Sequence, residues 1–167
     1  VESVKPNRLR INLELPAQII AGMTRSTGLS AAWLHGTPAG ALRTIVETEM
    51  FPMKTTFRGY EKFSFDDPGA VWFPSKDVLF EGTLDASGKA DIPLSFPDKV
   101  VAPGKMKAWF TTRVFEEGGD FSIRIQETEF SPFRKYLGIK MPDDDDGWYQ
   151  TGEVYHPEVV ALSSGGK

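Results

Sequence analysis

The apolar residues of this chain recur with a period of two. Between residues 8 and 15, Leu9, Ile11, Leu13 and Leu15 alternate with polar side chains. Successive side chains of a β-strand point to opposite faces, so this pattern predicts a strand with one buried face. By contrast, we find no window with the 3.6-residue apolar stripe of an amphipathic helix. The alternation therefore predicts an all-β fold.

Seven strands are expected, separated by turns that contain glycine and proline. They span residues 8–15, 29–33, 42–51, 78–84, 89–96, 106–115 and 121–130. Short strands at this spacing are typical of an antiparallel β-sandwich. Pro93 lacks a backbone donor, which favours an edge strand or a bulge at that position. The alternation slips at Gln126 and Glu127, which predicts a β-bulge there.

The length of 167 residues suits one domain, and 12 Phe, 4 Trp and 4 Tyr supply the bulk of a sizeable core. Five side chains on the apolar faces of alternating strands are expected to be buried between the two sheets. They are Leu13, Trp33, Ile92, Phe110 and Ile123.

Two segments stand outside this sandwich pattern. The connector, residues 52–75, is long and rich in aromatic side chains, and we expect it to pack on the body of the protein. After residue 132, two more strands are expected, at 136–141 and 154–162. Because two strands cannot bury a core alone, we assign residues 5–132 to the sandwich and 133–167 to the opening of a second, truncated domain. Whether this tail packs in cis or pairs in trans is left open.

The chain carries few groups that support catalysis. It has no cysteine, which excludes disulfides, thiolate nucleophiles, thioesters and Cys-ligated zinc within it. His35 and His156 lie in no hydrolase motif, and each is interpreted as a structural or surface histidine. We therefore predict no catalytic residue, no cofactor-binding residue and no enzyme activity. A net charge of −4 argues against nucleic acid, and no apolar run approaches the roughly 20 residues of a membrane span.

Two clusters allow a binding function. Four consecutive aspartates, Asp143 to Asp146, offer oxygen ligands, but consecutive side chains diverge, so a solvated loop is favoured and no metal site is predicted. Trp109 lies on the face opposite Met106 and Ala108, where an exposed tryptophan can stack on sugar rings. The alternative function is thus a carbohydrate- or protein-binding β-sandwich module of a cell-surface protein.

Several short segments stand out by their order and spacing along the chain. They are WLHGTPAGA at 33–41, TTRVFEEGGD at 111–120, FSPF at 130–133, YLGI at 136–139, and then GW at 147–148, TG at 151–152 and VVA at 159–161. Taken together in this order, they resemble the macroglobulin-type domains of bacterial alpha-2-macroglobulins, and the resemblance covers nearly the whole chain. The resemblance implies a fibronectin-III-like sandwich of seven strands followed by the start of another such domain.

The resemblance also implies a function. Members of that family trap a protease that cuts an exposed bait segment, and in many of them a thioester captures it. This chain would then be a non-catalytic structural domain of such a protease inhibitor, and a thioester would lie elsewhere. Its partners would be neighbouring macroglobulin-type domains of the same parent chain and, through the full-length protein, target proteases. The implied location is the bacterial periplasm or cell envelope, with lipid anchoring through another part of the parent left open.

Overall fold

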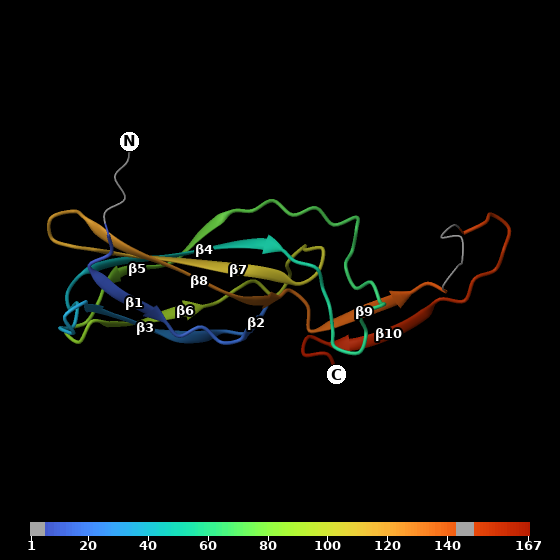
Figure 1. The fold of residues 1–167 in the computed structure, drawn as a ribbon, viewed down its shortest axis with the longest axis horizontal. Helices are drawn as coiled ribbons and strands as arrows, with labels where there is room; N and C mark the ends of the chain where they lie inside the picture. The colour runs from blue at the N-terminus through green and yellow to red at the C-terminus, as the bar shows by residue number, and fades with distance from the viewer. Residues whose placement is uncertain (1–5, 143–148) are drawn as a thin grey trace.

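The computed structural model describes residues 6–142 and 149–167, and these contain ten β-strands and no helix (Figure 1). The predicted all-β class is confirmed. The strands are β1 (Leu9–Leu13), β2 (Gln18–Ile20), β3 (Arg25–Trp33), β4 (Arg43–Pro52), β5 (Lys76–Thr83), β6 (Lys89–Leu94), β7 (Met106–Phe115), β8 (Phe121–Ser131), β9 (Lys135–Lys140) and β10 (Glu158–Ser163).

Eight of the strands found in the described residues form two facing sheets, and the other two form a ribbon. The small sheet has the order β1-β3-β6, and the large sheet has the order β2-β8-β7-β4-β5. The ribbon, β9 paired with β10, projects from one end of this sandwich (Figure 1). The N-terminal half of the chain therefore contributes to both sheets, whereas the ribbon comes only from the C-terminal end.

The expected set of seven antiparallel strands is incomplete, because the sandwich also contains β2. This strand pairs in parallel with β8, Gln18 lying opposite Glu129. Three residues are too few to display an alternating pattern, so the sequence gives no signal for them. The sandwich region is thus eight-stranded within the described residues, with one parallel pair.

The core lies between the two sheets and is centred on β7. Leu13, Ile92 and Phe110 are fully buried there, and Phe110 has no exposed surface. Trp33 lies on the same inner face, but at the end of the sandwich, where it is only partly buried. The Arg8 guanidinium covers its ring at 5.6 Å from the centroid.

Strand β8 presents the opposite face to the one we expected. It pairs with β7 residue by residue from Phe115↔Phe121 to Met106↔Phe130, so the predicted bulge at Gln126–Glu127 is wrong. In this register the even-numbered residues of β8 share the inner face with Phe110. Ile123 therefore points outward and is half-buried, and its assignment to the core is also wrong.

Phe130 on the inner face of β8 is buried in the core, but two other inward residues of this strand are polar and bind the backbone at β1. The Ser122 hydroxyl accepts hydrogen bonds from the backbone N–H groups of Arg8 (3.0 Å) and Leu9 (3.1 Å). The Gln126 amide both accepts from the N–H of Leu13 and donates to its carbonyl, each at 2.9 Å. Side chains of the large sheet thus bond to the edge of the small sheet at β1.

At the other edge of the small sheet lies β6, which carries Pro93. The prediction of an edge position for Pro93 is confirmed. The turn that leads into β6 is held by Asp85, whose carboxylate accepts from the N–H groups of Lys89 (2.9 Å) and Ser87 (2.8 Å). The pKa of Asp85 is held below its usual value by its hydrogen bonds, and the bond from the Lys89 N–H has the largest effect.

Truncation of Phe110 tests the packing of the sandwich. Phe110→Ala is expected to lower the free energy of unfolding by about 3–5 kcal/mol, because it removes transfer energy and leaves a cavity. Ile125→Ala, on the outer face of β8 and 56% exposed, is the control and should cost far less. Equal losses for the two variants in urea unfolding would contradict the assignment of faces.

Candidate functional site

The candidate site is the place where the connector joins the sandwich to the ribbon. Phe57 and Phe65 of the connector are buried together with Tyr136 and Leu162 of the ribbon, and they form a second hydrophobic core. The expectation that the connector packs on the body of the protein is confirmed. It covers one face of the ribbon, so this part of the tail packs in cis.

Close packing of aromatic rings holds this second core together. The Phe57 ring meets Phe65 edge-on with centroids 4.8 Å apart, and meets Tyr136 at 5.6 Å. Gly138 of β9 lies directly against the Phe65 ring, and a Cβ atom there would come within 2.3 Å of it. Backbone hydrogen bonds of 2.8 and 2.9 Å between Ser64 and Ile139 fix the connector along β9. The absence of a side chain at residue 138 therefore permits this contact.

The Tyr136 hydroxyl ends in a small hydrogen-bonded group beneath the ribbon. It lies 2.6 Å from the Ser131 hydroxyl, which itself donates to the Phe133 carbonyl at 2.8 Å. Since the Ser131 proton is used in that bond, Tyr136 is the donor to Ser131. Burial raises the pKa of the Tyr136 phenol, because the charged phenolate loses its hydration there.

A buried lysine lies where the connector meets the sandwich. The Lys105 ammonium is 2.8 Å from the Glu129 carboxylate, and its side chain is only 7% exposed. It also lies over the Phe57 ring, 4.4 Å from the centroid. Its backbone is held as well, because its N–H donates to Thr55 Oγ1 (2.7 Å) and its carbonyl accepts from Met53 (3.0 Å).

Glu129 continues this contact to the ribbon. Its carboxylate also accepts a hydrogen bond from the Gln18 side-chain amide of β2. The same Gln18 nitrogen donates at 3.2 Å to the carbonyl of Ser164, which follows β10. We name Gln18, Phe57, Lys105, Glu129 and Ser164 the junction cluster. It brings together the large sheet, the connector and the ribbon at one point.

Beside the junction cluster, the backbone at Gly104 lies very close to the connector. The Asp66 carboxylate accepts from the N–H of Thr55 at 3.1 and 3.2 Å. A Cβ atom on Gly104 would come within 2.1 Å of the Asp66 carboxylate and 2.4 Å of Thr55 Oγ1. Glycine at residue 104 therefore lets the segment that carries Lys105 lie against the connector.

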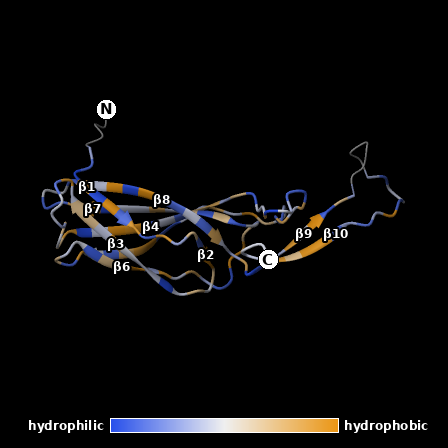
Figure 2. Cartoon of the chain, turned by 60° about the horizontal axis from the view of Figure 1, so that its bottom comes forward, coloured by the Kyte–Doolittle hydropathy of each residue, from blue (hydrophilic) through white to orange (hydrophobic). Residues whose placement is uncertain are grey.

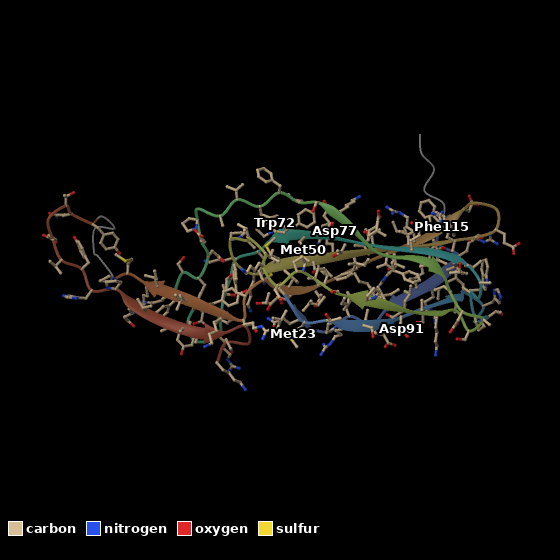
Figure 3. The ribbon with its side chains drawn as sticks, turned by 180° about the vertical axis from the view of Figure 1, so that it is seen from behind. Met23, Met50, Trp72, Asp77, Asp91 and Phe115 are labelled. Atoms are coloured by element: carbon tan, nitrogen blue, oxygen red, sulfur yellow. The ribbon has the colours of Figure 1, made fainter. Side chains whose placement is uncertain are left out.

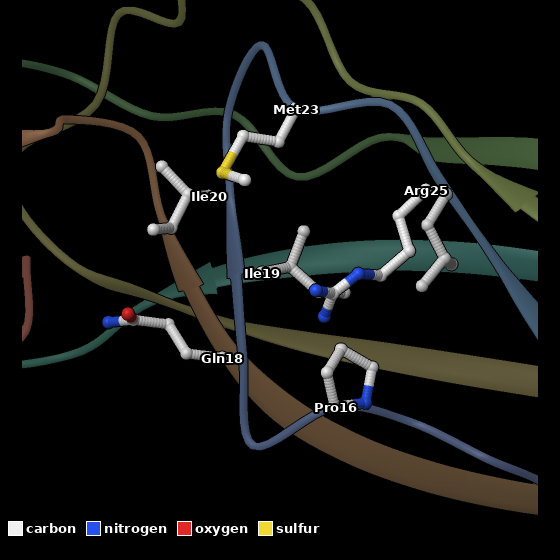
Figure 4. A pocket seen from close by; sticks show the side chains of 7 residues that line it. Pro16, Gln18, Ile19, Ile20, Met23 and Arg25 are labelled. Atoms are coloured by element: carbon white, nitrogen blue, oxygen red, sulfur yellow. The ribbon is translucent and has the colours of Figure 1, made fainter.

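The described part of the sandwich contains several hollows, and two of them involve apolar side chains beside the core. A pocket of about 90 Å³ is lined by apolar side chains such as Ile19 and Met23 together with Arg25 (Figure 4). A larger groove of about 380 Å³ lies beside Met50, Trp72 and Asp77, which are grouped in Figure 3. In that groove the Trp72 indole N–H donates to the Met50 carbonyl at 2.8 Å. The tryptophan is thus fixed to the sandwich by its polar edge.

The side chains that the sequence offered for chemistry do not come together. His35 and His156 are both exposed, and His35 stacks on Trp33 at 6.3 Å. The aspartates at 143–146 lie outside the described residues. In the described part of the chain, no group of three or more His, Cys, Asp or Glu side chains is arranged to hold a metal ion. Trp109 is 42% exposed and packs against Phe51 on the outer face of the large sheet.

The junction cluster was not found from the sequence. Its members lie far apart along the chain, and only the fold unites Gln18 with Glu129 and Lys105 with Phe57. A weak signal exists in Lys105, which directly precedes an apolar strand and follows Pro103 and Gly104. A lysine at such a position is ordinarily exposed, so the pattern alone gave no reason to single it out.

The described residues also include no helix of the length and apolarity that a membrane crossing requires.

The fold is an all-β arrangement of two facing sheets, and comparison with known proteins identifies its family. The family model described as the bacterial alpha-2-macroglobulin MG5 domain matches residues 7–132. The chain therefore belongs to the bacterial alpha-2-macroglobulin family. It is 26% identical over 167 residues to an alpha-2-macroglobulin homolog of Yersinia pestis, a match that covers 97% of this chain and 8% of that protein.

Solved structures share the fold. The native conformation of the Escherichia coli alpha-2-macroglobulin superposes with a TM-score of 0.66 at 17% identity, over 99% of this chain and 11% of that one. The trypsin-activated form of the Escherichia coli protein gives a TM-score of 0.62 at 19% identity, over 81% of this chain and 9% of that one. The sequence thus spans about a tenth of the length of these relatives.

A methyl group at Gly138 tests the second core. Gly138→Ala is expected to push Phe65 away from β9 and to loosen the ribbon, because the new Cβ overlaps the ring. Near-ultraviolet circular dichroism and limited proteolysis of the ribbon measure this. Gly165→Ala is the control, since its Cβ meets only Ser163 Oγ at 4.0 Å. Identical protection in both variants would contradict the packing described here.

Alkaline pH tests the burial of Tyr136. Because the pKa of this phenol is raised in the folded protein, its contribution to stability is fully present below pH about 10 and is lost as the pH rises through the folded value. Urea unfolding as a function of pH should show this loss in the native sequence. Tyr136→Phe should remove that part of the pH dependence. In an absorbance titration of the tyrosines, the same variant should lack the one phenolate signal that appears at unusually high pH.

Proposed function

We propose that this segment is a non-catalytic structural domain of a protease trap, and that it holds an architecture whose rearrangement encloses the protease. The observation that carries the proposal is the match of the MG5 family model over residues 7–132. The same fold occurs in both the native and the trypsin-activated form of the Escherichia coli relative. A domain that keeps its fold through activation suits rigid-body rearrangement about its interfaces.

We further propose that residues 5–132 form one domain and that residues 133–167 begin its neighbour. The ribbon is rich in apolar side chains (Figure 2). Its inner face packs on the connector, whereas Leu137, Ile139 and Val159 on its outer face are 67%, 48% and 62% exposed. Apolar residues on both faces are typical of a strand pair that is covered on both sides. Neighbouring macroglobulin-type domains of the parent chain are the partners that fit this face.

The remaining parts of the proposal concern the parent protein. Its target would be a protease that cleaves a bait segment elsewhere, and any thioester would also lie elsewhere, because this sequence has no cysteine. The relatives come from bacteria, and we place the parent in the bacterial periplasm or cell envelope. Neither the ion pairs nor the histidines of this segment would take part in a reaction.

The isolated chain is expected neither to inhibit nor to trap proteases, because a scaffold domain has no bait segment of its own. The assay compares trypsin activity toward a large protein substrate and toward a small peptide, with and without the chain. The full-length parent protein is the positive control, and should protect only the large substrate. A stoichiometric loss of activity toward the large substrate caused by the isolated chain alone would overturn the scaffold function.

One observation favours a second function. Trp109 is partly exposed on the outer face of the large sheet, beside the Phe51 ring at 5.0 Å. An exposed aromatic pair on a sheet can stack on sugar rings, as a carbohydrate-binding module requires. A glycan array distinguishes the two functions, since the scaffold domain should bind no glycan, whereas binding that Trp109→Ala abolishes would support the module.

A further inference from the structure

Lys105 is a buried charge at the point where the sandwich meets the second hydrophobic core. The sandwich core and the second core are separate clusters, and the Lys105 ammonium contacts Glu129 of the large sheet and Phe57 of the second core. We propose that Lys105 is a positioning residue that fixes the orientation of the β9–β10 ribbon relative to the sandwich. It does so through its ion pair with Glu129 and its contact with Phe57.

The first connection from Lys105 to the ribbon is polar. Its ammonium is paired with Glu129 on β8, Glu129 accepts from Gln18 on β2, and Gln18 donates to the Ser164 carbonyl after β10. Each of these bonds has a preferred distance and direction. The charge on Glu129 strengthens its contacts with both Lys105 and Gln18. If the Lys105 ammonium were lost, the Glu129 carboxylate would be free to shift, and this would disturb the bond from Gln18 to Ser164.

The second connection is aromatic. The ammonium lies over the Phe57 ring, and that ring forms edge-to-face pairs with Tyr136 of β9 and with Phe65. A Cβ atom on Gly166 would lie 3.0 Å from Phe57, so the turn after β10 also rests against this ring. The position of Phe57 therefore determines where both strands of the ribbon lie, and Lys105 constrains Phe57 from the side of the sandwich.

A charge restricts orientation more tightly than an apolar side chain at the same place. Purely apolar surfaces tolerate small slides, because the hydrophobic effect has no direction. A buried ammonium has lost its hydration, and a carboxylate offsets that loss only while it stays within reach, so a shifted ribbon that displaced Glu129 would leave an unpaired charge. The neighbouring pair Lys107–Glu127, at 3.0 Å, is 42% and 53% exposed, and water can replace either partner there.

This inference deepens the proposed function, on which its biological role rests, because a scaffold must pass an orientation from one domain to the next. The test of this inference requires no protease, so the inference and the proposed function can fail separately. The chain has no cysteine, and two spin labels can therefore be placed without background. Asp91→Cys on β6 (Figure 3) and Val159→Cys on β10 put one exposed label on the sandwich and one on the ribbon.

Double electron–electron resonance then measures the distribution of distances between the two labels. The labelled chain with its native Lys105 should give one narrow distribution, and Lys105→Met should broaden or shift it. Lys107→Met is the matched control and should leave it unchanged. An unaltered distribution in Lys105→Met would overturn the proposal, as would equal broadening in Lys107→Met.

A double variant separates positioning from mere stability. In Lys105→Met with Glu129→Leu, the partly buried carboxylate that lost its ammonium partner is also removed, so thermal stability should recover relative to Lys105→Met. The distance distribution should nevertheless stay broad, because Gln18, which donates to the Ser164 carbonyl, no longer has the Glu129 carboxylate to hold it. A native distribution in the double variant would show that the pair has only a structural role. Should Lys105→Met not fold, Glu129→Gln carries the same test, since it removes the partner's charge and keeps its shape.

Discussion

The hydrogen bonds between β8 side chains and the β1 backbone determine how this sandwich closes. Edge strands leave backbone groups that must find partners when they are buried. Here Ser122 and Gln126 supply those partners from the facing sheet. Their inward placement turns Ile123 and Ile125 outward, so the large sheet has an unusually apolar outer face at β8. The core is correspondingly carried by β7, β4 and the small sheet.

Alternation in the sequence was sufficient to predict a strand and its core residues where the buried face of the strand is also its apolar face. That condition holds for Leu13 in β1, Ile92 in β6 and Phe110 in β7, and these strands begin and end close to the expected residues. It fails in β8, where apolar residues point outward for the reason given above. The junction cluster was not predicted for another reason, because the partners of Lys105 are set by tertiary structure and its polar members, Gln18, Lys105 and Glu129, look like ordinary surface residues in the sequence.

The described residues thus form two packed bodies that are joined by polar contacts, among them those of Lys105 and of Tyr136. The sandwich core and the aromatic core beneath the ribbon bury different residues. The fold recurs in the native and trypsin-activated forms of a relative of low sequence identity. Because the same architecture occurs at 17% and 19% sequence identity, many different side chains are compatible with it.

Pro93 protects the flank of the protein against strand-mediated aggregation. β6 lies at the edge of the small sheet, where a regular strand would offer N–H groups to another chain. The proline removes one of these donors next to the end of the strand. β10, by contrast, contains no proline and carries exposed Val159. Solubility at high concentration therefore depends on the ribbon, and additives or fusion partners that shield that end should keep the protein monodisperse.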